Sequence, residues 1–112
     1  MVRRGEVYWY RFKSPDKRRP ILVLTRSGLV GHLGTVTVAA ITPTRRGVAS
    51  EVALGPEHGL PKTCAANLHN VLTIPKDEVG PFIAALPDEV MAQVDRAIAF
   101  ALGLGERAST GH

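Results

Sequence analysis

Cysteine and long apolar runs are scarce in this sequence, and each scarcity excludes a class of structure. Cys64 is the single cysteine, so neither an intramolecular disulfide nor a zinc site made of several thiolates can form. No stretch approaches the roughly 20 consecutive apolar residues that a membrane-spanning helix needs, so we expect no membrane partner. Arg3 and Arg4 are not followed by the apolar segment of a signal peptide. The sequence therefore predicts a cytoplasmic protein.

Signatures of metal and nucleotide sites are missing as well. The spacing of the four histidines matches no zinc signature, so we predict no metal and no cofactor. These histidines are His32, His58, His69 and His112. A glycine-rich phosphate loop and a serine nucleophile elbow are also lacking. Cys64 lies among small and apolar residues, which favours a buried structural thiol over a reactive one.

The sequence does contain enough apolar residues for one small core, and it carries an excess of positive charge. Its 112 residues are 45% hydrophobic, which suffices for a packed domain of this size. The net charge is 14 − 10 = +4, which favours polyanionic partners such as nucleic acid or an acidic protein segment. We expect residues 3–104 to form a single domain and the small, polar residues 105–112 to form a flexible tail.

Apolar segments separated by turn residues predict a series of β-strands. The predicted strands cover residues 7–12, 21–25, 35–41, 50–54, 64–75 and 81–86, with a kink or a break near Asn67. A turn is expected at residues 13–16, and the glycines between residues 28 and 34 predict a flexible connection.

One amphipathic helix is predicted at the end of the chain. Val90, Val94 and Ile98 recur at four-residue steps, which predicts a helix over residues 87–104 with a stop at Gly103. Strands followed by a single helix predict a mainly β (α+β) fold, in which a small twisted antiparallel sheet or barrel packs against the terminal helix.

A basic cluster precedes the second predicted strand. Arginine offers a planar, permanently charged fork of donors that matches a phosphodiester. Arg19 follows Lys17 and Arg18 and stands directly before Pro20 and a rigid apolar strand, a position suited to stabilising the charge of a phosphoryl transition state. A solvated strand edge that resists aggregation has the same composition, so this alternative stays open.

Hydroxyls and arginines follow the third predicted strand. Thr42 and Thr44 can hydrogen-bond a phosphate oxygen or a 2′-hydroxyl, or they can bond their own backbone in a turn. Arg45 and Arg46 come next, and we expect them to contact the backbone of a polyanion.

Polar residues interrupt the long strand predicted at residues 64–75. Asn67 and His69 would share one face of an extended strand, and Asn70 would lie on the other. His69 is either an acid–base residue or a structural histidine, since both occur in strands.

Three consecutive aromatic residues lie in the first predicted strand. Tyr8 and Tyr10 would share one face of it and Trp9 the other, so at least one face belongs to the core. The remaining aromatic surface either packs as well or stacks on bases.

Taken in order, these segments resemble the MazF/PemK family of toxin endoribonucleases. The matching motifs are an Arg-Gly-Glu start at residues 4–8, an Arg-Pro before a strand at 19–24, an apolar strand ending in threonine at 41–42, and a late strand at 71–76. The amphipathic terminal helix completes the series, so the resemblance runs from Arg3 to about Leu104.

The resemblance implies a small SH3-like barrel of the CcdB/PemK type and a homodimer. It implies the toxin of a type II toxin–antitoxin system, a metal-independent, sequence-specific endoribonuclease that cleaves single-stranded RNA. Attack by the 2′-hydroxyl would leave a 2′,3′-cyclic phosphate and a 5′-hydroxyl. A cognate acidic antitoxin would occupy the RNA groove, which suits the basic charge.

The family's functional residues map onto positions in this sequence. Its catalytic arginine falls on Arg19 and its catalytic hydroxyl on Thr42. RNA contacts are expected from Lys17, Arg18, Thr44, Arg45, Arg46, Asn67, His69 and Asn70. Because arginine stays protonated, we expect Arg19 to stabilise the phosphorane while water, Thr42 or His69 carries the proton.

The sequence also departs from the family pattern in the late strand. Leu72 stands where many members have a basic residue, which raises His69 as a substitute contact. Two other functions remain possible on the same fold: a non-catalytic CcdB-like poison of DNA gyrase, and a plain nucleic-acid-binding barrel. The cleavage motif and the class of RNA are not encoded in any readable pattern.

Overall fold

The computed structural model of the chain describes residues 2–13 and 17–106. Most of the turn expected at residues 13–16 and most of the tail expected at residues 105–112 lie outside the described residues.

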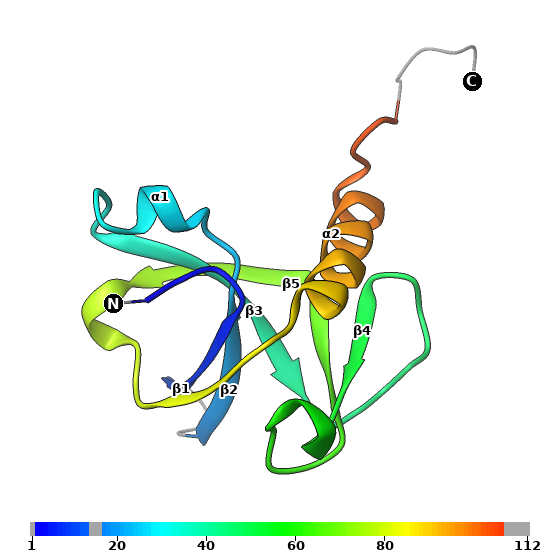
Figure 1. The fold of residues 1–112 in the computed structure, drawn as a ribbon, viewed down its shortest axis with the longest axis horizontal. Helices are drawn as coiled ribbons and strands as arrows, with labels where there is room; N and C mark the ends of the chain where they lie inside the picture. The colour runs from blue at the N-terminus through cyan, green and yellow to red at the C-terminus, as the bar shows by residue number, and fades with distance from the viewer. Residues whose placement is uncertain (1, 14–16, 107–112) are drawn as a thin grey trace.

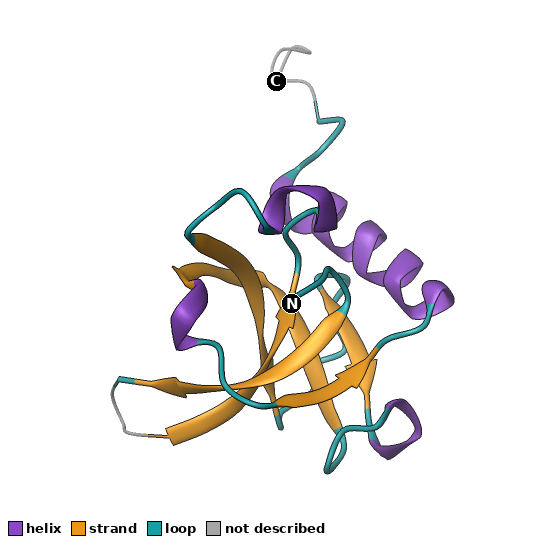
Figure 2. Ribbon diagram, turned by 60° about the vertical axis from the view of Figure 1, so that its left-hand side comes forward, coloured by secondary structure: helices purple, strands orange, loops and turns teal. Residues whose placement is uncertain are grey.

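Six β-strands form one curled antiparallel sheet (Figure 1). The strands are β1 Glu6–Phe12, β2 Lys17–Val23, β3 Thr35–Thr42, β4 Glu51–Leu54, β5 Cys64–Pro75 and β6 Phe82–Ala85. Their order across the sheet is β4-β5-β3-β2-β1-β6, and every pair of neighbours is antiparallel. The predicted mainly β fold with a terminal helix is confirmed, and the sheet has the curvature of a half-barrel (Figure 2).

Helix α2, Asp88–Leu102, lies across one face of the sheet (Figure 2). It buries Val90, Val94 and Ala97 against that face, as its apolar spacing predicts. Gly103 ends it in the left-handed conformation, with φ at 68°, and its N–H bonds the last turn. No helix in the described part of the chain is long and apolar enough to cross a membrane.

Three shorter helical segments connect the strands. They are α1 Ser27–Val30, η1 Pro56–His58 and η2 Lys76–Glu78. The flexible connection expected between the second and third strands is wrong in part, because α1 forms there. Val30, only 1% exposed, anchors this turn in the core, and apolar burial overrides the glycines on either side.

Two hydrophobic clusters occupy the two faces of the sheet. Because side chains alternate along a strand, Leu22 packs into the first cluster, beneath α2, while Ile21 and Val23 pack into the second. Tyr10 belongs to the second cluster and Tyr8 packs against it, so the shared face predicted for the two tyrosines is confirmed. Burial on both faces explains why the central strands have nearly continuous apolar sequences.

Strand β2 begins earlier than predicted. It starts at Lys17 rather than at residue 21, and its first residues pair with β1. Arg19 lies opposite Tyr10 in this pairing, so the basic cluster is part of the strand rather than a loop before it. The long apolar stems of these side chains make a strand position acceptable for charged residues.

Strand β5 is irregular where the sequence predicts a kink. The pairing with β3 steps from Ala39 opposite Val71 to Ala40 opposite Asn67. Residues 68–70 therefore have no partner in β3 and form a β-bulge. A bulge changes which side chains share a face, and this one lies at the edge of the site described next.

Candidate active site

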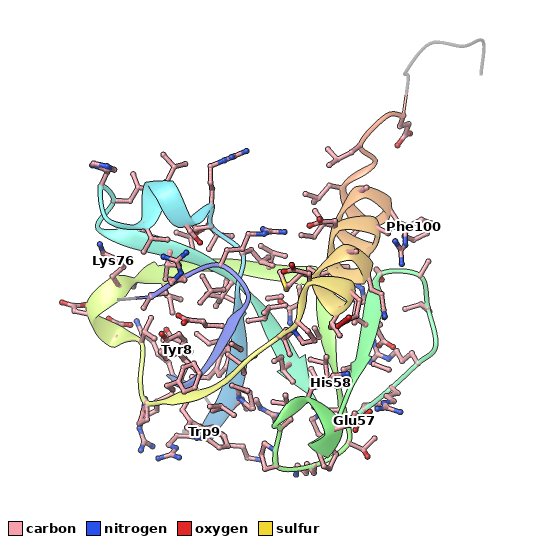
Figure 3. All side chains as sticks on the ribbon, viewed as in Figure 1. Tyr8, Trp9, Glu57, His58, Lys76 and Phe100 are labelled. Atoms are coloured by element: carbon pink, nitrogen blue, oxygen red, sulfur yellow. The ribbon has the colours of Figure 1, made fainter. Side chains whose placement is uncertain are left out.

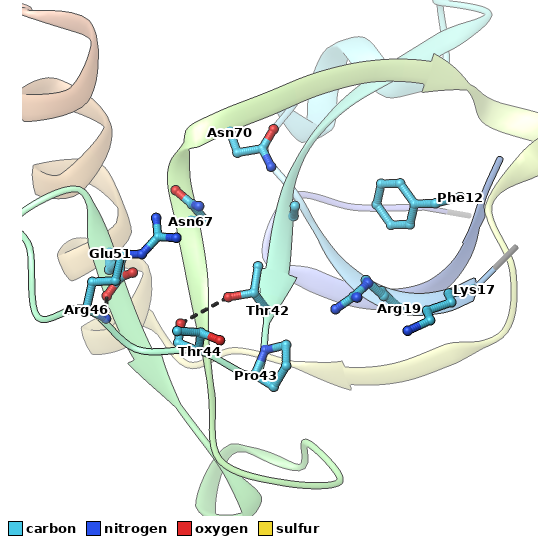
Figure 4. Close-up of a pocket in the computed structure, with 11 residues that line it drawn as sticks. Phe12, Lys17, Arg19, Thr42, Pro43, Thr44, Arg46, Glu51, Asn67 and Asn70 are labelled. Atoms are coloured by element: carbon cyan, nitrogen blue, oxygen red, sulfur yellow. Dashed lines mark hydrogen bonds between the residues drawn. The ribbon is translucent and has the colours of Figure 1, made fainter. Parts of the chain in front are cut away.

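A cavity of about 430 Å³ opens at one end of the sheet face that carries the second cluster (Figure 4). On that face, alternate residues of β2 change from Val23 and Ile21 to Arg19. Alternate residues of β3 change in the same direction, from Val38 to the small Ala40 and then to Thr42. The cavity forms where the apolar filling ends, and its size is that of a small-molecule or nucleotide pocket.

Residues from five strands and from the loop after β3 line this active pocket. They are Phe12, Lys17, Arg19, Ala40, Thr42, Pro43, Thr44, Arg46, Glu51, Asn67 and Asn70. Seven of the ten residues that the sequence analysis selected are therefore brought together in one cavity: Lys17, Arg19, Thr42, Thr44, Arg46, Asn67 and Asn70.

Arg19 and Thr42 enter the active pocket from neighbouring strands. The register between β2 and β3 places Ile21 opposite Ala40. Arg19 and Thr42 each lie two residues further along their strands, on the same face, and Figure 4 shows both side chains at the pocket. Arg19 is half-buried in a paired strand, which restricts the guanidinium more than an end-of-strand position would.

Thr42 makes a local hydrogen bond and lines the active pocket as well. Its hydroxyl donates to the backbone oxygen of Thr44 over 3.1 Å, as the turn alternative predicts. That bond uses the hydroxyl proton and leaves the oxygen lone pairs on Thr42 free to accept. Thr42 can therefore bond its own turn and still accept a hydrogen bond from a ligand.

Arg45 is turned toward the protein. Its Nε donates to the backbone oxygen of Cys64 over 3.0 Å, and its terminal nitrogen donates to that of Leu54 over 2.6 Å. It thereby ties the loop after β3 to the adjacent ends of β4 and β5. The neighbouring Arg46 lines the active pocket instead, so two adjacent arginines have different surroundings.

Glu51 was not selected from the sequence, yet it lines the active pocket. Its Oε1 accepts the backbone N–H groups of Arg46 and Gly47 over 2.9 and 3.1 Å. Gly47 adopts φ of 71°, a conformation that glycine tolerates without strain. This carboxylate therefore shapes the turn that presents Arg46. A lone glutamate at the start of a short strand gives no signal of such a role.

The bulge in β5 overturns the expected arrangement of three polar residues. Asn67 and Asn70 both line the active pocket, whereas His69 does not. The Nδ1 of His69 is hydrogen-bonded to the buried hydroxyl of Ser50, and its backbone N–H donates to the Asn67 side chain over 3.2 Å. The expectation that Asn67 and His69 share a face is wrong, because the strict two-residue alternation holds only in a regular strand.

Arg18, the last of the ten selected residues, is not part of the lining of the active pocket. The guanidinium carbon of Arg18 lies 4.7 Å from the ring centroid of Trp9, a cation–π arrangement.

Cys64 is 5% exposed, and burial raises the pKa of its thiol. The predicted buried cysteine is confirmed, and the effect of burial on its pKa outweighs that of the nearby Arg45 and Lys62.

The charge of the active pocket suits a polyanion. Three cationic side chains line it, those of Lys17, Arg19 and Arg46, against the one carboxylate of Glu51. In the described residues, no group of three or more histidines, cysteines, aspartates or glutamates is placed to hold a metal ion. Curled sheet, packed helix and cationic pocket are together the features of a small protein that binds phosphodiesters.

Comparison with known proteins gives the family. A family model described as PemK-like, MazF-like toxin of type II toxin–antitoxin system matches residues 3–102. The chain therefore belongs to the family of PemK-like, MazF-like toxins, as the sequence motifs predict.

Individual relatives agree with the family match. Endoribonuclease MazF3 of Mycobacterium tuberculosis is 41% identical over 88 residues, which cover 79% of this chain and 82% of the relative. The structure of Mycobacterium tuberculosis toxin MazF-mt6 superposes with a TM-score of 0.81 at 35% identity, covering 88% of this chain and 97% of that one. A mycobacterial endoribonuclease in complex with its cognate antitoxin gives 0.83 at 31% identity, covering 93% and 97%.

Proposed function

We propose that this toxin is a metal-independent, sequence-specific endoribonuclease that cleaves single-stranded RNA. The endoribonuclease class rests on the family and on relatives of that name at 33–42% identity. The observation that carries the finer proposal is the meeting of Arg19 and Thr42 in one cationic cavity. A gyrase poison would need neither residue, so this pairing favours catalysis.

The proposed reaction uses the substrate's own nucleophile. The 2′-hydroxyl attacks the adjacent phosphorus, and negative charge develops on the phosphoryl oxygens in the transition state. The Arg19 guanidinium donates its fork of hydrogen bonds to these oxygens, which is electrostatic stabilisation by a group already in position. The P–O5′ bond then breaks, leaving a 2′,3′-cyclic phosphate and a 5′-hydroxyl.

Proton transfer needs a group other than arginine, because arginine remains protonated in proteins. The Thr42 oxygen lies in the active pocket with its proton already directed to Thr44, so it can accept a hydrogen bond from the 2′-hydroxyl. We assign the net proton transfer to water in this open pocket. His69 lies outside the pocket lining and is bonded to Ser50, which argues against its use as the base.

Contacts with RNA are proposed for the rest of the active pocket. Lys17 and Arg46 would neutralise phosphates, and Thr44 would donate to a phosphate oxygen. The amides of Asn67 and Asn70 can read base edges of an unpaired strand, because each offers both donors and an acceptor. These contacts would give the enzyme its sequence preference.

The partners follow from the same proposal. A cognate acidic antitoxin would bind over the cationic pocket and exclude RNA, as complementary charge favours. The solved relative in complex with its cognate antitoxin supports an antitoxin as partner. We further propose a homodimer in the cytoplasm, with residues 3–104 as the toxin domain.

The chemistry of the product ends tests the proposed function. RNA fragments made by the purified protein are expected to carry 2′,3′-cyclic phosphates and 5′-hydroxyls, detectable by mass spectrometry and by end labelling. DNA of the same sequence should remain intact, because it lacks the 2′-hydroxyl. Fragments with 3′-hydroxyl and 5′-phosphate ends would contradict the mechanism, and intact RNA would favour a non-catalytic barrel.

A further inference from the structure

A second cavity, of about 170 Å³, lies beside the active pocket and is so far without a role. We propose that it binds a nucleobase of the RNA strand next to the scissile phosphate, by stacking on Trp9 and Arg18. This inference rests on the proposed function, since it deepens the substrate contacts of the same site.

The lining of this base cavity has the chemistry of a nucleobase site. Its apolar part combines the indole of Trp9 with Pro20, Ile41, Pro61 and the buried Cys64. The charged part consists of Arg18, Arg19 and Lys62. Apolar and aromatic surface together with cationic side chains matches a base and its phosphates, whereas the active pocket is more polar.

The base cavity adjoins the active pocket. Arg19, Thr42 and Pro43 line both cavities, so they form the wall between them. A phosphate held by Arg19 and Thr42 would therefore lie at the border of the two spaces. The base of a neighbouring nucleotide is one sugar away from that phosphate, which places it within reach of the second cavity.

Trp9 is held firmly enough to serve as a stacking platform. Its backbone N–H donates to Pro81 over 2.9 Å, and its backbone oxygen accepts the N–H of Gly80 over 2.8 Å. The guanidinium of Arg18 lies over the ring, 4.7 Å from its centroid. A base can extend this stack at little ordering cost, because the ring and the guanidinium already lie against each other.

The single tryptophan gives a direct readout of the proposal. We would titrate the protein with end-labelled single-stranded deoxyoligonucleotides, which cannot be cleaved, and with abasic strands of the same length and charge. Fluorescence anisotropy of the label measures binding, and indole emission reports stacking. We expect quenching by base-bearing strands and none by abasic strands that bind. Equal quenching by both, or binding of bases without quenching, would overturn the proposal.

Variants separate the base cavity from general binding. Trp9→Leu should weaken binding of base-bearing strands by roughly five- to a hundredfold and leave abasic strands unaffected, because stacking is lost while the cations remain. Trp9→Phe should retain part of the affinity. Phe100→Leu is the matched control, since Phe100 is exposed on α2, away from Trp9 (Figure 3). Unchanged affinity of Trp9→Leu would contradict the proposal.

The titration tests the base cavity and the cleavage assay tests the enzyme activity, so either proposal can be refuted without the other. Base-dependent quenching without any RNA cleavage would leave the base cavity standing and refute the enzyme. Cleavage without base-dependent quenching would do the reverse. If Trp9→Leu does not fold by circular dichroism, the wild-type titration and Trp9→Phe still decide the question.

Discussion

Replacing Arg19 by alanine is expected to slow RNA cleavage by about two to three orders of magnitude, the usual loss when one preorganised transition-state donor is removed. Arg19 lines the active pocket beside Thr42, and it belongs to a paired strand rather than to a loop. Single-turnover cleavage rates at saturating enzyme would measure this effect without interference from RNA binding.

Arg19→Lys distinguishes charge from geometry. Lysine keeps the positive charge but loses the planar fork, so we expect a rate between those of wild type and Arg19→Ala. Arg96→Ala is the matched control, because it removes one exposed positive charge from α2, outside both cavities. Wild-type rates in Arg19→Lys would show that the bidentate role is wrong, and wild-type rates in Arg19→Ala would remove it from catalysis.

Replacing Leu68 by alanine is expected to lower the free energy of unfolding by about 2–5 kcal/mol, as for other fully buried leucines. Leu68 is 0% exposed and packs in the first cluster, from within the bulge of β5. Its backbone N–H also donates to the buried Ser50 over 2.8 Å. Loss of the side chain therefore leaves a cavity beneath the segment that positions Asn67 and Asn70.

Denaturation with urea, followed by circular dichroism, measures the effect of Leu68→Ala. Val71→Ala is the matched control in the same strand, because Val71 is 38% exposed and surface changes of this kind stay within about 0.5 kcal/mol. A loss below about 1 kcal/mol for Leu68→Ala would contradict the idea that the bulge is anchored by its buried leucine.

Much of this architecture could be predicted from the sequence because its causes are local. The aromatic run of β1, the nearly continuous apolar run of β3 and the four-residue steps in α2 are each visible within a single element. The roles of Arg19 and Thr42 were predictable through the family motifs, whereas the structure was needed to bring both side chains to one cavity. Charge alone would not have separated Arg19 from Arg18.

The rest depends on tertiary contacts that no local pattern encodes. The bulge of β5 directs Asn70 into the active pocket and His69 to Ser50, which a regular strand would not do. The adjacent Arg45 and Arg46 point to different surroundings, because Arg45 donates to the backbone oxygens of Leu54 and Cys64. The carboxylate of Glu51 reaches the pocket because it accepts a hydrogen bond from the backbone of Arg46 in the loop after β3, a contact between segments that no local pattern predicts.

We expect this protein above all to cut RNA without a metal, by means of Arg19 and Thr42. The most direct test is a time course of a long single-stranded RNA with purified protein in excess EDTA, beside Arg19→Ala and Thr42→Ala. We predict site-specific cuts by wild type that both variants lose while their circular dichroism is unchanged. No cuts in several different RNAs, or equal cuts by all three proteins, would contradict the claim.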